Sequence, residues 1–509
     1  MFKRLSRTGR EEWIWAGLLV WSVVPFFWFD QIPAVDVPAH QYTAYLIGHL
    51  LQGGGGPLGR VFEAVWKPWP NGLSCVVLGI LQQVVGWVWA GKIMMAATCL
   101  AIPLSFRYLL QRLGVASPIP AFWVLPLVHH HLLYLGFLNF IWGLALMMLL
   151  LGYWTGRDSF SFKAWLFFVV LTLVLYFCHP LAWILALGMG LGLIGIEPRQ
   201  RWTRVWHFMA GWIPSALLML WYLSVSPQIG MGDRNPAGQL LFNGLFLGVA
   251  LPFPGLVDSA AVVCFAVFVL ICSVWVIWKV WKSPAARPDL FLVYAVLAFA
   301  LVVLMPDKSA GGSLIQYRLL LVPWLLFLVW LACRVESMPY LSSTGAVLSV
   351  VVAMVLWLRI WGVFSDYQQP SGAFQKLLDP IPDNRSLLVV TSVGFREHLG
   401  MRTNFWEHAY LNVAANGKRI ACLNHYQARV HGFPVRFRAS MNPHRSLGYA
   451  ESGVQGLNFR AYQRSSGFYP DYVLLLGDDD PGVIREYYEW IAQVRTNGWS
   501  ASLWKMKDR

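Results

Sequence analysis

The stretch that organises the chain reads Phe29-Asp30-Gln31-Ile32-Pro33-Ala34-Val35-Asp36-Val37-Pro38-Ala39-His40. It directly follows the first long apolar run, residues 13–29, and so lies where a chain leaving a bilayer first meets water. Two carboxylates and an imidazole stand together there, and ionisable groups close to a membrane are functional candidates by default. The later apolar runs can return further polar groups to the same membrane face.

The composition is that of an integral membrane protein. Of the 509 residues, 57% are hydrophobic and 13% are charged, whereas soluble proteins carry about 25% charged residues. The net charge is +14, but among residues 1–365 the Lys and Arg residues lie mainly in short loops between apolar runs. That distribution follows the positive-inside rule. It favours membrane lipids as surroundings and argues against nucleic acid as a partner.

The apolar runs predict a polytopic α-helical membrane protein with about 11 transmembrane helices. The first run follows several basic residues and ends in bulky aromatic residues rather than a small-residue cleavage site, so we expect a retained helix with a cytoplasmic N-terminus. Further spans are expected at residues 92–110, 119–134, 136–154, 163–179, 181–196, 205–224, 258–281, 289–305, 318–333 and 344–363.

The orientation of the spans depends on residues 72–90. Arg107 and Arg112 fall on the cytoplasmic side only if this apolar segment does not cross the membrane. We therefore predict a first outer loop, residues 30–71, followed by a re-entrant or membrane-lying helix at residues 72–90. Inside the loop, residues 38–51 have mixed polar and apolar positions and are expected to lie along the membrane surface.

The composition changes near residue 366, and this divides the chain into two predicted domains. Residues 1–365 form the transmembrane domain, and residues 366–509 form a soluble α/β domain on the outer, periplasmic face. Short β-type runs at Leu387–Val390 and Tyr472–Leu476 predict strands, and residues 482–495 predict a helix.

Asp36 is the main candidate for a proton acceptor. It precedes His40 by four residues, so the two side chains can share one face of a helix. Asp36 is equally well placed to cap a helix that starts near Pro38, because Asp is a favoured N-cap residue. Both roles remain open. Asp30 is the weaker alternative, since it lies nearest the end of the first span.

Four cations are candidates for binding an anionic group such as a phosphate: Arg318, Lys308, Arg234 and Lys67. Arg318 begins an apolar run at its predicted outer end, and the others lie in predicted outer loops. The alternative for each is an ordinary contact with lipid headgroups, because long cationic side chains near span ends commonly reach the interface.

Two further candidates lie near apolar segments. His179 interrupts an apolar run before Pro180, where it is either a functional group or a hydrogen-bonded residue at a helix break. Trp69 lies in the first outer loop and can either stack on a sugar ring or anchor the interface. Neither the cysteine spacings nor His129–His131 predict a metal site. Binding of a divalent metal by other residues remains an open alternative.

The layout resembles that of a known superfamily. One span precedes the sequence Asp-Val-Pro-Ala-His at residues 36–40, then Lys-Pro-Trp-Pro-Asn at residues 67–71, then a span ending in Arg-Tyr-Leu-Leu-Gln-Arg-Leu-Gly at residues 107–114. Residues 136–143, Gly-Phe-Leu-Asn-Phe-Ile-Trp-Gly, are also typical of it. The chain is similar to the GT-C integral membrane glycosyltransferases, in particular to bacterial relatives of protein O-mannosyltransferases and of the lipid A aminoarabinose transferase.

The resemblance implies an enzyme in the bacterial inner membrane. It implies a polyprenyl-phosphate sugar donor, a glycan, lipid or protein acceptor, inversion at the sugar, and catalysis by an acidic residue of the first outer loop, which maps onto Asp36. Many relatives carry two adjacent acidic residues there, whereas Val37 follows Asp36 in this chain. A single carboxylate base, with no certain cofactor, is therefore the simpler expectation.

Two other functions remain open at the level of sequence. A transporter or flippase of a lipid-linked saccharide is expected to show interrupted spans in two matching halves and charges near the midplane, but here the ionisable groups concentrate near one predicted face. A membrane acyltransferase that uses a histidine is the other alternative, and His179 would be its candidate residue.

Overall fold

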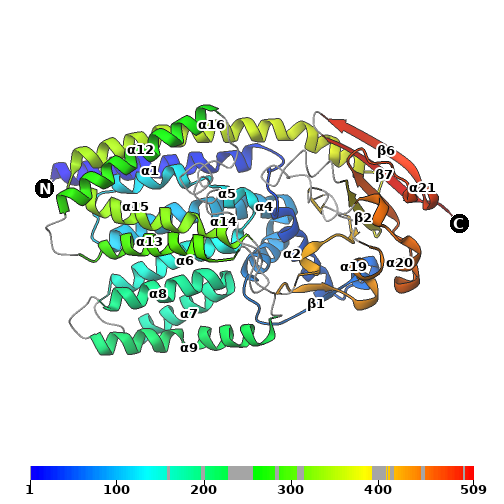
Figure 1. Cartoon of the computed structure of the whole chain (residues 1–509), viewed down its shortest axis with the longest axis horizontal. Helices are drawn as coiled ribbons and strands as arrows, with labels where there is room; N and C mark the ends of the chain where they lie inside the picture. The colour runs from blue at the N-terminus through cyan, green and yellow to red at the C-terminus, as the bar shows by residue number, and fades with distance from the viewer. Residues whose placement is uncertain are drawn as a thin grey trace. The chain divides into compact units, whose positions relative to one another are not determined.

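The computed structural model (Figure 1) describes these residues: 2–157, 161–195, 201–226, 256–280, 286–306, 314–392, 409, 411–412, 418–430, 432–448, 453–496 and 499–508. They form two compact units. The helical unit contains Met1–Trp28, Pro68–Leu73 and Met95–Gly362, and the α/β unit contains Phe29–Lys67, Ser74–Met94 and Val363–Arg509. The first outer loop thus groups with the C-terminal region, so the compact units differ from the predicted domains. The predicted boundary at residue 365 stays a prediction.

Long apolar helices build the helical unit, together with short helices between them. They are α1 (Phe2–Trp28), the second part of α4 (Leu73–Arg112), η1 (Ile119–Leu127), α5 (His131–Leu135), α6 (Leu138–Thr155), α7 (Phe162–Cys178), α8 (Pro180–Gly195), α9 (Arg201–Val225), α12 (Leu256–Val280), α13 (Asp289–Leu304), α14 (Ile315–Leu319), α15 (Leu321–Val335) and most of α16 (Pro339–Leu378). In Figure 1, α6, α7, α8 and α9 lie side by side and pack on one another.

Small residues let the helices of this unit approach closely. A Cβ added at Gly143 of α6 would lie 2.8 Å from the Cβ of Ala182 on α8. Such positions bring backbones together where lipid-like surroundings supply no hydrophobic driving force between helices. Helix α6 is accordingly almost completely buried, and it forms the centre of the helical unit.

Six helices within the described residues are long and apolar enough to cross a membrane. They include α4, α6, α9, α12, α16 and the combined α14 and α15, and α7, α8 and α13 are shorter apolar helices. The prediction of a polytopic α-helical membrane protein is confirmed. The count of 11 spans is not.

One predicted span does not form a continuous α-helix. Residues 119–134 fold as the nine-residue 3₁₀ helix η1 and then enter the short α5. Pro126 is the physical reason, because proline at an interior position lacks the N–H that an α-helix requires there. The expectation of one continuous helix over residues 119–134 was wrong. That this segment crosses the membrane stays a prediction.

The predicted re-entrant segment, residues 72–90, is interrupted. Helix α4 is broken at Gly86, whose φ of 79° and ψ of 173° are not helical. Glycine reaches such a conformation without steric cost, whereas other residues do so rarely. The segment therefore consists of one helix before Gly86 and the start of a second helix after it. That residues 72–90 do not cross the membrane stays a prediction.

A five-stranded mixed sheet forms the core of the α/β unit. Its order is β3 (Ala421–Cys422), β2 (Ser386–Thr391), β5 (Tyr472–Leu476), β7 (Trp499–Met506) and β6 (Tyr488–Thr496). Strands β3, β2 and β5 are parallel, and β7 runs antiparallel to both of its neighbours. The predicted α/β character and the two predicted strands are confirmed, because β2 and β5 are apolar runs buried on both faces.

The prediction of a helix at residues 482–495 was wrong for most of these residues. Only α21 (Val483–Tyr487) is helical, and residues 488–496 form β6, which pairs with β7 from Tyr488↔Met506 to Thr496↔Trp499. Glu489, Ala492 and Gln493 are helix formers in isolation. Pairing with a neighbouring strand outweighs that local preference.

The first outer loop contains helices and a strand. Helix α2 (Val37–Leu51) is followed by α3 (Gly56–Val61) and β1 (Phe62–Ala64), and β1 pairs antiparallel with β4 (Val435–Phe437). Residues 37–44 are all buried, so protein covers α2 on every side of its first two turns. A helix that contacts a membrane along its whole length would bury only its apolar face against protein. That residues 38–51 lie along the membrane surface stays a prediction.

Candidate functional site

A cationic cluster in the helical unit centres on Arg318. The guanidinium lies over the ring of Phe137, 4.2 Å from the ring centroid, and its Nη1 is 3.0 Å from Nε2 of His179. The ring of Phe140 meets His179 edge-on, with centroids 4.9 Å apart. We call Arg318, His179, Phe137 and Phe140 the Arg318 cluster. The structure thus brings together two residues singled out separately in the sequence.

The hydrogen-bond partners of His179 contain a conflict. Its Nδ1 accepts from the backbone N–H of Leu181 at 3.2 Å, while its Nε2 faces the arginine. A neutral imidazole has one N–H and one accepting nitrogen, and a guanidinium only donates. If Nδ1 accepts, Nε2 carries the proton and points at another donor. An anion that accepts from both groups would remove this conflict.

Short helix α14 positions Arg318. It begins after Leu314, which has the left-handed φ of 56°. The fully buried Gln316 donates to the carbonyl of Val302 at the end of α13, and Nε2 of His131 lies 3.3 Å from the carbonyl of Tyr317. These contacts place α14 against α13 and the start of α5. They also give His131, in the triple-histidine stretch, a contact within the fold.

Asp36 occupies the N-cap position of α2, yet its side chain makes no capping hydrogen bond. Its backbone carbonyl accepts from the N–H of His40 at 3.0 Å. The residue is half-buried. The Asp36 carboxylate therefore does not cap α2, although the sequence left that role open. Its role as a base stays a prediction.

His40 belongs to a buried polar network of the α/β unit, which we call the Thr43 network: Thr43, His425, Gln427, His40 and Tyr426. The Thr43 hydroxyl donates to Oε1 of Gln427 at 2.6 Å, so at 2.7 Å it accepts from Nε2 of His425. The Gln427 amide then donates to Nδ1 of His40 at 3.3 Å and to the Tyr426 hydroxyl at 3.1 Å. Each of these donors meets an acceptor, so His40 is held in one orientation.

The other sequence candidates are spread over the molecule. Lys67 is exposed in the α/β unit. Trp69, in the helical unit, is 5% exposed and packs on Trp221 at 5.3 Å between ring centroids and on Tyr222. Lys308 and Arg234 lie outside the described residues. Within those residues, no group of three or more His, Cys, Asp or Glu side chains could hold a metal.

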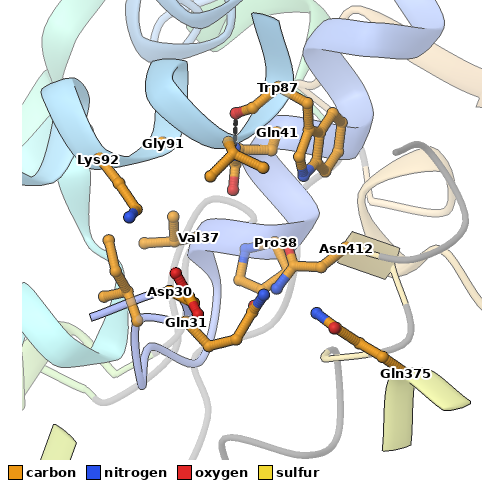
Figure 2. Close-up of a pocket in the computed structure, with 12 residues that line it drawn as sticks. Asp30, Gln31, Val37, Pro38, Gln41, Trp87, Gly91, Lys92, Gln375 and Asn412 are labelled. Atoms are coloured by element: carbon orange, nitrogen blue, oxygen red, sulfur yellow. Dashed lines mark hydrogen bonds between the residues drawn. The ribbon is translucent and has the colours of Figure 1, made fainter. Parts of the chain in front are cut away.

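Asp30 lines a pocket of the α/β unit (Figure 2), and the pocket also contains residues that the sequence did not single out. The most notable is Lys92, which lies after the break in α4 and is 6% exposed. A lysine within an apolar run is a recognisable signal, but here the run reads as an ordinary span. The pocket walls also carry the carboxamides of Gln31, Gln41, Gln375 and Asn412.

Burial also affects Cys422, whose thiol lies beside the Thr43 network. The backbone N–H of Cys422 donates to the hydroxyl of Tyr42 at 3.0 Å, and that hydroxyl donates to the carbonyl of Ile420 at 2.6 Å. Complete burial raises the pKa of the Cys422 thiol well above its usual range, because the thiolate would lose its hydration. We therefore expect the thiol to be inert rather than reactive.

Solved structures share this fold. The crystal structure of ArnT from Cupriavidus metallidurans bound to undecaprenyl phosphate aligns with a TM-score of 0.52 and 10% sequence identity, over 97% of this chain and 98% of that one. The apo structure of the same protein aligns with a TM-score of 0.55 and 10% identity, over 98% of each chain. The sequence matches no protein-family model and no curated protein.

These alignments extend over nearly the whole of both chains. ArnT is a lipid A aminoarabinose transferase of the GT-C type, and it is the relative that the sequence pattern indicated. The predicted resemblance is therefore confirmed at the level of the fold: this chain is a multi-pass helical membrane protein with an ArnT-like architecture.

Proposed function

We propose that the chain is a membrane glycosyltransferase that moves a sugar, with inversion, from a polyprenyl-phosphate donor to an acceptor. The observation that carries this proposal is the Arg318 cluster, where Nη1 of Arg318 and Nε2 of His179 lie 3.0 Å apart although Nδ1 of His179 already accepts a hydrogen bond. An oxyanion that binds beside this pair would accept from both groups. The fold likeness to ArnT, one structure of which is bound to undecaprenyl phosphate, supports a lipid-linked phosphate as that anion.

The reaction would be a single displacement. The acceptor hydroxyl oxygen attacks the anomeric carbon, and the bond between that carbon and the phosphate oxygen breaks. The electron pair leaves with the phosphate, whose developing charge Arg318 would stabilise, as fixed donors do for oxyanions in general. The acceptor proton would pass to Asp36, a half-buried carboxylate that caps no helix. Lys67, Lys308 and Arg234 are further proposed contacts for the donor phosphate.

The proposed orientation follows the distribution of basic residues. The N-terminus would lie in the cytoplasm, and residues 366–509 would face the periplasm of a bacterial inner membrane. A cysteine introduced at Ser465, an exposed position of α20 (Phe459–Ser466), tests this in intact cells. Labelling by a membrane-impermeant maleimide is expected, and labelling only after lysis would reverse the orientation.

The test of the activity uses the purified chain, a polyprenyl-phosphate sugar and a mixture of envelope lipids and glycans as acceptors. Release of polyprenyl phosphate that depends on the acceptor is expected. Asp36→Asn should abolish release, and Asp366→Asn is the matched control because it removes an exposed carboxylate of the same compact unit. Equal loss in both variants, or full turnover in Asp36→Asn, would remove Asp36 as the base. Movement of the donor between leaflets without release would identify a transporter instead.

A further inference from the structure

The pocket beside Asp30 has an unusual combination of side chains. It has a volume of about 50 Å³, opens to solvent, and lies within the α/β unit. Its polar wall contains four carboxamides, one carboxylate and one ammonium, and Trp87 and Pro38 supply flat apolar surfaces. A pocket of this size holds the polar end of a ligand, such as one edge of a sugar ring, and its opening leaves room for the rest. It is too small and too polar for a polyprenyl chain.

Lys92 is the charged group that requires an explanation. Only 6% of this residue is exposed to solvent. Figure 2 shows its ammonium directed toward the side of the pocket where Asp30 and Val37 lie. Within the described residues its one recorded interaction is with the ring of Trp89, at 5.4 Å from the centroid. No described residue forms an ion pair or a hydrogen bond with the ammonium, and the carboxylate of Asp30 lines the same pocket without pairing with it. Burying an ammonium in that way is costly, and a bound anion would offset the cost.

The carboxamides point to the rest of the ligand. Oδ1 of Asn412 is buried without a hydrogen-bond partner among the described residues. The backbone of Gln31 is held on both sides by Gln368, whose Oε1 accepts from its N–H and whose Nε2 donates to its carbonyl, each at 3.0 Å. That arrangement fixes the position of Gln31 and leaves its side chain to the pocket. Carboxamides donate and accept, as sugar hydroxyls do, so the two groups are complementary.

The break in α4 builds one wall of this pocket. The residue after Gly86 is Trp87, whose carbonyl accepts from Nε2 of Gln41 at 3.0 Å. A Cβ at Gly91 would lie 2.6 Å from that same Nε2. Both glycines are therefore needed for Gln41 and Trp87 to take these positions. The wall is a built feature of the fold and not an accidental gap between side chains.

We propose that this pocket binds a saccharide unit that carries a negative charge. Lys92 contacts the anionic group, the carboxamides and Asp30 contact the hydroxyls, and Trp87 packs on the ring face. The site is distinct from the Arg318 cluster, which lies in the other compact unit. If the chain is the proposed transferase, the natural acceptor would supply this saccharide. Only this identification of the acceptor rests on the proposed function.

Direct binding tests the proposal without any lipid donor. Full-length protein in lipid nanodiscs is titrated with glucuronate, glucose 6-phosphate, glucose and inorganic phosphate, and saturation-transfer NMR reports the bound fraction. The two charged sugars should bind at least about tenfold more tightly than glucose, the ratio expected for one charge-assisted hydrogen bond. They should also bind more tightly than phosphate, which has no ring. The stronger of the two identifies a carboxylate or a phosphate as the natural charge.

Two variants locate the binding. Lys92→Met keeps the chain length and should abolish the preference for charged sugars, whereas Lys376→Met removes an exposed lysine next to Gln375 and should change nothing. Asn412→Ala should weaken all the sugars by a similar factor and preserve the preference, which keeps the test informative if the Lys92 variant does not fold.

Three results would overturn the proposal: equal affinity for glucose and glucuronate, an unchanged preference in folded Lys92→Met, or binding of no sugar at all. The Arg318→Met variant distinguishes failure of the saccharide-binding proposal from failure of the transferase proposal. It should bind glucuronate as the wild type does, whether or not the chain transfers a sugar.

Discussion

The Arg318 cluster and the Thr43 network are both buried polar groups around a histidine, but their hydrogen bonds are arranged differently. In the Thr43 network, His425 donates to Thr43, Thr43 donates to Gln427, and Gln427 donates to His40 and Tyr426. In the Arg318 cluster, both nitrogens of His179 face donors. A network in which each donor meets an acceptor helps to specify a fold. A surplus of donors is what a site for an anion requires.

The largest expected effect is on transfer in Arg318→Met. Loss of a fixed donor to developing negative charge should lower turnover by about 100- to 1,000-fold, with little change in the thermal unfolding midpoint. Arg318→Lys keeps the charge but loses the planar contact with Phe137. Its turnover should therefore lie between that of the wild type and that of Arg318→Met. Arg359→Met, at an exposed position of α16, is the control. An unfolding midpoint that drops as far as activity does would make Arg318 a structural residue.

Next in size is the loss of stability in Thr43→Val. The change keeps the shape of the side chain and removes the hydroxyl that links His425 to Gln427. Two buried polar groups lose a partner, so the free energy of unfolding should fall by about 1–3 kcal/mol. Denaturation in detergent measures this, with the exposed Ser465→Ala as control. Turnover per folded molecule should be retained, and a loss of turnover at full stability would place the network in the reaction.

The smallest expected effect belongs to His179→Phe. The ring contact with Phe140 remains, while the nitrogen that faces Arg318 is lost. We expect transfer to fall by about tenfold, or about 1.4 kcal/mol, with a weaker apparent affinity for the lipid donor. His207→Phe, on the exposed side of α9, is the comparison. If His179→Phe is as active as the wild type, His179 only ends α7, and the contrast between the two histidine sites disappears.

What the sequence predicts best is what depends on local composition. The apolar runs gave a polytopic helical protein, and the buried strands β2 and β5 are short apolar segments between turns. Residues 488–496 were misread, because their helix-forming side chains gain a strand partner that is visible only in the folded chain. Residues 119–134 were misread because hydropathy was weighed above the prolines.

The site was predictable to a smaller extent. Arg318 and His179 each stood out as ionisable groups in apolar surroundings, but nothing in their spacing shows that they meet across 139 positions. The Thr43 network escaped detection for the same reason, since the bonds between its two segments join positions 382 to 387 apart. Gln31 and Asn412 are common surface residue types, and only their arrangement around Lys92 gives them a role.

The pairing of β1 with β4 has a consequence for how the protein is made. Phe62 pairs with Phe437, and Tyr42 bonds to Ile420, so a segment from the start of the chain completes its fold with residues made near the end. Non-local pairings of this kind form late and slowly. During synthesis, the segment that holds Asp36 must wait while all the intervening helices are inserted into the membrane.

The nascent chain is therefore expected to be inactive until its last hundred residues emerge. A fragment of residues 366–509 would likewise lack β1 and α2, which pack against it in the whole chain. Coexpression of this fragment with residues 1–365 should restore folding where the fragment alone aggregates. The C-terminal region is thus the second half of an interrupted domain, whose first half is delivered before most of the membrane helices.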